Sequence, residues 1–226
     1  MESICIVYQD EWLVAAHKPS GMLCQATGAP HDKYANAEAV VSEQLGYRAW
    51  ALHRLDRATS GLLLLAKDTA YLAAFQQLFA TRQIEKIYHA WVVGELTEDS
   101  GSLLQPLSIP HQPGQLQSAS TSYQRLAQRT IAAPNHRPAS LPLHYLEITL
   151  HTGRKHQIRR HFGGIQCPLL GDEQYGRSGY NRLAERLWGS RHLWLHSRRA
   201  AFIHPYTHEP LVLECPLPET WRPLMG

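Results

Sequence analysis

The sequence lacks the segments that a membrane or the secretory pathway requires. No apolar run approaches the roughly 20 residues of a membrane-spanning helix. Residues 1–8 contain no cationic region followed by a long apolar segment, so no signal peptide is indicated. Only four cysteines occur in 226 residues, widely scattered and without a Cys-x-x-Cys pair. We therefore expect reduced thiols in a cytoplasmic protein.

The 14 histidines lack the spacing of a metal enzyme. His151, His156 and His161 recur every five residues, a spacing that does not place them on one face of a helix. No His-Glu-x-x-His motif accompanies them. We expect no catalytic metal and no metal site among the functional residues.

The composition is that of an ordinary globular protein. Hydrophobic residues make up 44% and charged residues 18%, so the chain can bury a core and is not disordered. Its length allows one ample domain or two small ones. No internal repeat, long low-complexity tract or clean linker divides it, and we expect a single domain over residues 1–226.

Positive charge is concentrated in one part of the chain. Residues 151–204 carry 10 of the 22 Lys and Arg residues but only 3 of the 19 acidic ones, a local net charge of +7 in a chain of net charge +3. Such a block indicates a polyanionic partner, RNA or DNA. A solvated basic surface is the alternative explanation.

Hydrophobic periodicity and capping residues predict an α+β fold. We count many short strands and at least three helices, without regular βα alternation. Strands are expected at 4–8, 12–17, 62–66, 84–93, 121–126 and 143–150; helices at 37–45, ended by Gly46, at 69–81, capped by Asp68 or Thr69, and from Thr152 or Gly153 to Gly163 or Gly164. The Pro-rich tail from Cys215 is expected to face solvent.

The string His53–Gly61 reads His-Arg-Leu-Asp-Arg-Ala-Thr-Ser-Gly and precedes the apolar run Leu62–Ala66. If it is extended, Arg54 and Asp56 share one face, and the arginine keeps the carboxylate ionised. Taken alone, Arg-x-Asp is most often a salt bridge. The whole string is more specific when it is considered together with two further strings of the sequence.

The second string is Lys86-Ile-Tyr-His-Ala90, on an expected strand. The third is Thr-Gly-Arg-Lys-His-Gln-Ile-Arg-Arg, residues 152–160. Together with His53–Gly61 they resemble the signature motifs of the RluA-type family of pseudouridine synthases, which convert uridine in RNA to its C-glycoside isomer. The segment Lys18-Pro-Ser-Gly21 also resembles the family's N-terminal part, where its role is that of a scaffold.

The resemblance implies roles for particular side chains. Asp56 would be the catalytic aspartate, Arg159 its charge partner, and Tyr88 the tyrosine that lies over the target base. Arg54 would fill the place of a flipped-out nucleotide. The remaining candidates for RNA contact are Ile158, against the reacting nucleotide, and the basic residues Arg154, Lys155 and Arg160, of which Arg154 is either structural or phosphate-facing.

The resemblance also implies a fold and a chemistry. The family has a single catalytic domain with a mixed, largely antiparallel sheet and flanking helices. The reaction breaks an N-glycosidic bond and forms a carbon–carbon bond to the same sugar, so no cofactor is required. An ionised carboxylate can attack the sugar or base covalently, or stabilise cationic sugar character and take a proton; both routes stay open.

Within the family, the sequence is most similar to the tRNA pseudouridine synthases that modify the acceptor-stem uridine at position 65. An enzyme acting on rRNA, or on both rRNA and tRNA, is the alternative, and a non-catalytic RNA-binding protein is a more distant one. We expect a monomer without the S4-type RNA-binding domain that many rRNA-modifying members carry. Residues 95–140 contain no recognisable family motif.

Overall fold

The computed structural model describes residues 3–26, 28, 36–133, 139–189 and 191–225. The chain forms two compact units. Unit 1 comprises Met1–Lys86 and His196–Pro218, and unit 2 comprises Ile87–Leu195 and Glu219–Gly226. No helix in the described ranges is long and apolar enough to cross a membrane.

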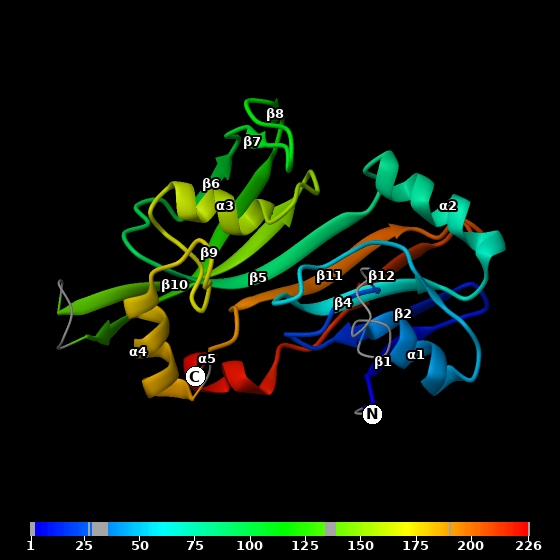
Figure 1. Ribbon diagram of the computed structural model, residues 1–226, viewed down its shortest axis with the longest axis horizontal. Helices are drawn as coiled ribbons and strands as arrows, with labels where there is room; N and C mark the ends of the chain where they lie inside the picture. Colours follow the sequence, from blue (N-terminus) through cyan, green and yellow to red (C-terminus); the bar gives the residue numbers. More distant parts are fainter. Residues whose placement is uncertain (1–2, 27, 29–35, 134–138, 190, 226) are drawn as a thin grey trace. The chain divides into compact units, whose positions relative to one another are not determined.

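Unit 1 is built on a sheet in which β1, β2, β4 and β11 are successive neighbours (Figure 1). β12 extends the sheet beside β11, and β3 pairs with β4. β11 runs parallel to β4, whereas the other pairs are antiparallel. The bounds are β1 Ile6–Gln9, β2 Leu13–Lys18, β3 Trp50–Ala51, β4 Ser60–Ala66, β11 Leu195–Ile203 and β12 Pro210–Glu214. The sheet is therefore mixed and largely antiparallel, as predicted.

The core of unit 1 explains the apolar run of β4. Every residue of Ser60–Ala66 is buried, which accounts for the lack of alternation in its sequence. Leu62 and Leu64 belong to one cluster with Phe75 of α2 (Thr69–Ala80) and Phe202 of β11. Side chains from α2 and from the strands β2, β4, β11 and β12 thus meet in this cluster.

The two helices of unit 1 begin and end where their capping residues predict. The Asn36 side chain accepts a hydrogen bond from the Ala39 N–H (3.0 Å) at the start of α1, Ala37–Leu45. Gly46 ends α1 with a φ of 75°. Asp68 caps α2 by accepting from the Ala70 N–H (2.9 Å).

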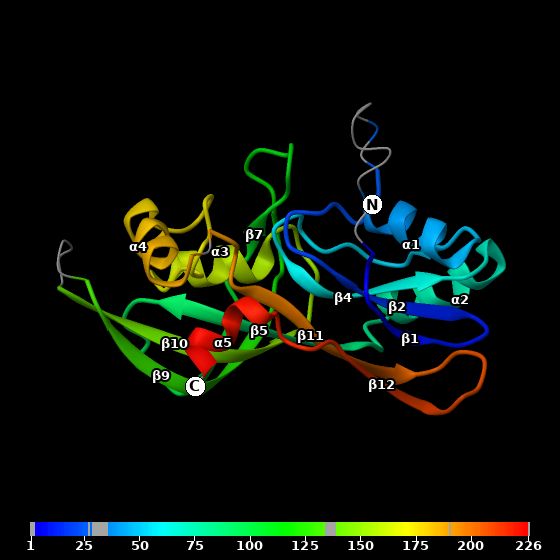
Figure 2. The ribbon, with the colours of Figure 1, turned by 90° about the horizontal axis from the view of Figure 1, so that it is seen from below.

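Unit 2 contains an antiparallel sheet in the order β5–β10–β9–β6. Its strands are β5 Glu85–Val93, which begins in unit 1, β6 Ser100–Leu103, β9 Thr121–Ala132 and β10 Ser140–Leu150; β7 Leu107–Ser108 and β8 Leu116–Gln117 form a separate pair. The helices are α3 Gln157–Gly164, α4 Ser178–Trp188 and α5 Arg222–Met225, the last preceded by the 3₁₀ helix η2, Glu219–Trp221. Figure 2 shows α3 and α4 on one side of this sheet.

The expected end of β9 is wrong, and the expected exposure of the C-terminal tail holds only in part. β9 extends to Ala132, six residues beyond the predicted end, because its polar outer half pairs with β10 along its whole length. The tail from Cys215 faces solvent only in part: Cys215, Trp221 and Leu224 are buried, whereas most of the other residues are exposed. Trp221 stacks on Trp194, with ring centroids 5.4 Å apart, so an aromatic contact anchors a segment whose prolines indicated exposure.

Gly61 permits the close approach of β4 to β11. Its φ is +113°, and a Cβ there would lie 2.3 Å from the Ser197 carbonyl oxygen. We expect Gly61→Ala to lower the free energy of unfolding by roughly 2–4 kcal/mol. Gly46→Ala is the control, because Gly46 also has positive φ but no atom within 4 Å of such a Cβ. Urea denaturation should show the larger loss for Gly61→Ala; equal losses would contradict the steric explanation.

Candidate active site

The string His53–Gly61 contains the loop that joins β3 to β4, and this loop carries the predicted catalytic carboxylate. Leu55 is buried at 7% exposure, Arg54 is exposed and Asp56 is half-buried. Arg54 and Asp56 thus flank a buried residue and are both more exposed than it is. The Thr59 N–H donates to the Asp56 carbonyl (3.0 Å), closing a turn directly after the aspartate.

The segment Lys18–Cys24 holds this loop by hydrogen bonds. The Gly21 N–H donates to the Arg57 carbonyl (2.8 Å), and the Ser20 hydroxyl donates to the Ala58 carbonyl (2.7 Å). The Leu55 N–H donates to Cys24 Sγ (3.1 Å). The loop is thus fixed on both sides of Asp56, which is the positional precision that a catalytic group needs.

Lys18 is a buried charged residue beside the Asp56 loop, and the sequence did not reveal its contacts with that loop. Its side chain is fully buried, and Nζ donates to the carbonyls of Pro19 (2.9 Å), Met22 (2.8 Å) and Arg57 (3.2 Å). Burial lowers the pKa of Lys18 to about 8, opposed by its electrostatic interactions with Cys24 and Asp56. Lys18 therefore holds the loop through the Arg57 carbonyl and places a positive charge near Asp56. The signal was its place in Lys-Pro-Ser-Gly, directly after a strand.

We expect Lys18→Met to change how stability depends on pH. The folded protein binds fewer protons than the unfolded chain between the lowered pKa of about 8 and the ordinary 10.5. The contribution of Lys18 to the free energy of unfolding should therefore rise with pH across this interval, by on the order of 3 kcal/mol relative to Lys18→Met. Urea denaturation at several pH values should show that Lys18→Met lacks the rise; parallel pH profiles would contradict the assignment.

His53 anchors the start of the loop. Its Nε2 accepts a hydrogen bond from the Leu64 N–H of β4 (3.1 Å), and its ring packs on Phe79 of α2 at 5.0 Å. Burial, assisted by the charge of Lys86, lowers the pKa of His53 to about 4. At neutral pH His53 is therefore an uncharged structural contact, and its acceptor nitrogen is already engaged.

Unit 2 carries the other predicted site residues. Tyr88 of β5 is 7% exposed and lies opposite Ile148 of β10. Tyr123 is the neighbour of Ile148 in β9, and its ring meets Phe162 of α3 edge-on at 5.6 Å. Tyr88 is thus on the face of the sheet that α3 covers, where Ile158 is also buried, at 4% exposure.

Arg159 of α3 forms a buried ion pair that the sequence did not predict. Its Nε donates to Asp172 Oδ2 (2.8 Å) and its Nη2 to Asp172 Oδ1 (2.9 Å). The N–H groups of Gln174 and Tyr175 also donate to Oδ1. Burial raises the pKa of Asp172, but these hydrogen bonds outweigh it and hold the pKa below its usual value. The expected pairing of Arg159 with Asp56 stays a prediction.

The predicted start of α3 is wrong. The helix begins at Gln157, five residues after Thr152, and its N-cap residue His156 makes no side-chain capping bond. The Thr152 hydroxyl instead donates to Gln157 Oε1 (2.7 Å), which also accepts from the Arg154 N–H (3.0 Å). The Gln157 side chain thus stabilises a turn where a first helical turn was expected.

The four basic candidates for RNA contact occupy two kinds of position. Arg54 and Lys155 are exposed. Arg154 donates through Nε to the Ser118 carbonyl (3.0 Å), and Arg160 donates through Nη2 to the Ser108 hydroxyl of β7 (2.6 Å). Arg154 and Arg160 therefore also hold the loops of unit 2, and only the first two present their charge freely to solvent.

Comparisons with known proteins agree with these motifs. Residues 12–163 match the model of the family described as RNA pseudouridylate synthase. The tRNA pseudouridine synthase C of Vibrio cholerae is 35% identical over 98% of this chain and 94% of that protein; the Salmonella typhimurium protein of the same name is 36% identical over 96% and 86%. The structure of human RNA Pseudouridylate Synthase Domain Containing 4 superimposes with a TM-score of 0.72 at 26% identity, covering 97% of this chain and 92% of that one.

The chain therefore belongs to the RNA pseudouridylate synthase family and is an RNA-modifying isomerase of that activity. The RluA-type resemblance and the α+β fold are confirmed. The matched segment includes the Asp56 loop, Tyr88 and the 152–160 string, whereas Asp172 lies beyond it.

Proposed function

We propose that the enzyme converts a specific uridine of tRNA to pseudouridine, with Asp56 as its catalytic carboxylate. The observation that carries the substrate class is the near full-length similarity to proteins named tRNA pseudouridine synthase C. The target is an acceptor-stem uridine of the position-65 type. Asp56 is supported by its half-buried place in a loop that Lys18, Ser20 and Gly21 hold from one side.

The chemistry needs no redox partner or activated nucleotide. The N1–C1′ bond of the uridine breaks, the uracil turns, and C5 bonds to C1′; the proton of C5 leaves and N1 regains one. Atoms and charge balance within the nucleoside and solvent protons. A positioned carboxylate suits such a reaction, because it can stabilise electron-poor C1′ and accept a proton.

The other site residues support Asp56 in this proposal. Arg159 keeps the carboxylate ionised, and Tyr88 packs against the target base. Arg54, exposed in the same loop as Asp56, fills the space that the flipped nucleotide vacates. Its planar guanidinium can stack between bases, which partly offsets the few kcal/mol lost on unstacking.

The basic surface of unit 2 supplies phosphate contacts in this proposal. Lys155 is exposed, and so are Arg182 and Arg186, one turn apart on α4. They belong to the segment 151–204, whose net charge is +7. Contacts of this kind make affinity for RNA fall steeply with salt, without selecting a sequence.

Domain number, oligomeric state and cellular compartment are part of the proposed function. Residues 1–226 act as one catalytic domain and as a monomer in the cytoplasm. The four cysteines, all of them free thiols, support a reducing compartment.

Chemical mapping of pseudouridine in total RNA, from cells with and without the gene, tests the substrate. We expect one tRNA acceptor-stem site to lose pseudouridine without the gene and to regain it when the wild-type gene is restored. Loss confined to ribosomal RNA would contradict the tRNA proposal. The gene for Asp56→Asn serves as the matched control, because it should restore the protein without restoring the modification.

A further inference from the structure

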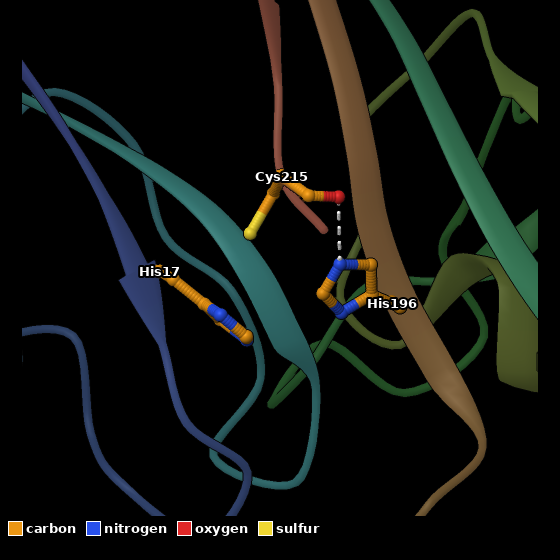
Figure 3. Close-up of side chains that lie close together, drawn as sticks. All are labelled: His17, His196 and Cys215. Atoms are coloured by element: carbon orange, nitrogen blue, oxygen red, sulfur yellow. Dashed lines mark hydrogen bonds between the residues drawn. The ribbon is translucent and has the colours of Figure 1, made fainter. Parts of the chain in front are cut away.

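Three potential metal ligands converge within unit 1, on elements far apart in the sequence. His17 lies on β2, His196 on β11, and Cys215 directly after β12 (Figure 3). Their ligand atoms all lie within 4.8 Å of one another. His196 and Cys215 are fully buried, and His17 is half-buried, which leaves an approach from solvent.

The strand register explains this convergence. His17 is paired with Leu62 of β4, and His196 is paired with Ser60. Because residues two apart on a strand point to the same side, the two histidines meet on one face of β4. Their rings lie edge to face, with centroids 5.3 Å apart. The Cys215 N–H donates to the Arg198 carbonyl (2.8 Å), which holds the thiol beside β11.

We propose that His17, His196 and Cys215 form a binding site for Zn²⁺, with a fourth position left for water. Two imidazoles and one thiolate form a donor set that binds Zn²⁺ in preference to the harder ions Mg²⁺ and Ca²⁺. The three proposed ligands take no part in the isomerisation chemistry, although His196 contacts Ser60 at the start of β4. The site does not depend on the tRNA proposal.

The distances suit a site that closes around an ion. With Zn–N of about 2.0–2.1 Å and Zn–S of about 2.3 Å, tetrahedral ligand atoms lie roughly 3.3–3.7 Å apart. The ligand atoms of the three residues now lie up to 4.8 Å apart, so they must move about 1 Å closer together to bind the ion. Rotation of the half-buried His17 and of the Cys215 thiol can supply it without moving a strand.

The second hydrogen bond of His196 fits a metal ligand. Its Nδ1 lies 2.9 Å from the Ser60 hydroxyl, and its Nε2 lies 3.4 Å from the Cys215 carbonyl oxygen (Figure 3). A histidine that binds metal through one nitrogen usually donates the other N–H to an oxygen atom. Binding of an ion through Nε2 uses the tautomer in which Nδ1–H donates to Ser60, and it replaces the contact between Nε2 and the Cys215 carbonyl.

Cobalt binding tests the site, because Co²⁺ replaces Zn²⁺ in such geometry and is coloured. The full chain, carrying Cys5→Ser to remove its exposed thiol, is stripped of metal and titrated with Co²⁺. We expect one equivalent to bind, with a thiolate-to-cobalt charge-transfer band and the visible bands of four-coordinate cobalt. Zn²⁺ should displace both.

Three further substitutions locate the ion. Cys215→Ser should abolish the charge-transfer band, and His17→Asn should weaken binding at least tenfold. Cys167→Ser is the matched control, a buried cysteine of unit 2 whose thiol donates to the Glu95 carbonyl (3.1 Å); it should leave the titration unchanged. Circular dichroism in chelator checks folding, and if Cys215→Ser does not fold, His17→Asn decides. No charge-transfer band in the parent, or undiminished binding in His17→Asn, would overturn the proposal.

Discussion

Replacing Asp56 with asparagine is expected to lower the rate of uridine isomerisation by on the order of 10³-fold or more, while RNA still binds. Asparagine keeps the shape of the side chain but has neither its charge nor a basic or nucleophilic oxygen. Because Arg54 and the basic surface of unit 2 are unchanged, affinity for RNA should persist. The measurements are single-turnover conversion of a tRNA transcript and a parallel binding titration.

Asp68→Asn is the matched control for this substitution. Asp68 is exposed and caps α2 through its side chain, a role that asparagine performs equally well. This variant should turn over at the wild-type rate. A purified Asp56→Asn protein that still isomerises tRNA at a comparable rate would remove Asp56 from the mechanism.

Replacing Arg159 with leucine is expected to have the largest effect on stability, a loss of about 3–5 kcal/mol at neutral pH. The substitution leaves Asp172, whose side chain is fully buried, without its bidentate partner. Arg222→Leu is the control, because Arg222 pairs with Glu219 at 77% exposure of both side chains and should change stability little. Urea denaturation measures both losses.

Lowering the pH should reduce the difference in the free energy of unfolding between Arg159→Leu and the wild type. Wild-type Asp172 has a lowered pKa, so its contribution is present above the unfolded pKa of about 3.9 and is lost only below it. In Arg159→Leu, the guanidinium no longer offsets the effect of burial on the pKa of Asp172. The Asp172 carboxyl therefore takes up a proton more readily. Denaturation at about pH 5 should therefore show a smaller difference than at neutral pH; a constant difference would contradict the buried-charge explanation.

A double variant separates the structural role of Arg159 from its proposed role toward Asp56. Asp172→Asn removes the buried charge but keeps an oxygen for the N–H groups of Gln174 and Tyr175. Arg159→Leu combined with Asp172→Asn should therefore recover most of the lost stability. Isomerisation should stay low, because no guanidinium supports Asp56. Full activity in this stable double variant would show that Arg159 acts only as the structural partner of Asp172 and not on Asp56.

The parts of the fold that depend on neighbouring residues were predictable from the sequence. Asn36 and Gly46 delimit α1 through hydrogen bonds and backbone angles within a few residues. The unbroken apolar run of β4 indicated a strand buried on both faces. The three family strings likewise located the Asp56 loop, Tyr88 and the segment before α3, since each is a short pattern of residue types.

Contacts between distant segments were not predictable in this way. The carbonyl of Arg57, to which Lys18 donates, is 39 positions along the chain. The burial of Trp221 depends on Trp194, and proline content alone pointed to the opposite result. The Arg159 pair was missed for another reason: Asp172 lies 13 positions after Arg159 and outside the three family strings.

The central claim is that this enzyme isomerises a uridine of tRNA by means of Asp56. Tritium release from tRNA labelled at uridine C5 tests it most directly, because C5 exchanges its hydrogen for the bond to C1′. Purified wild-type protein should release label equivalent to a single uridine per tRNA, and Asp56→Asn should release none above background. Equal release by both proteins, or release from ribosomal RNA but not from tRNA, would contradict the account.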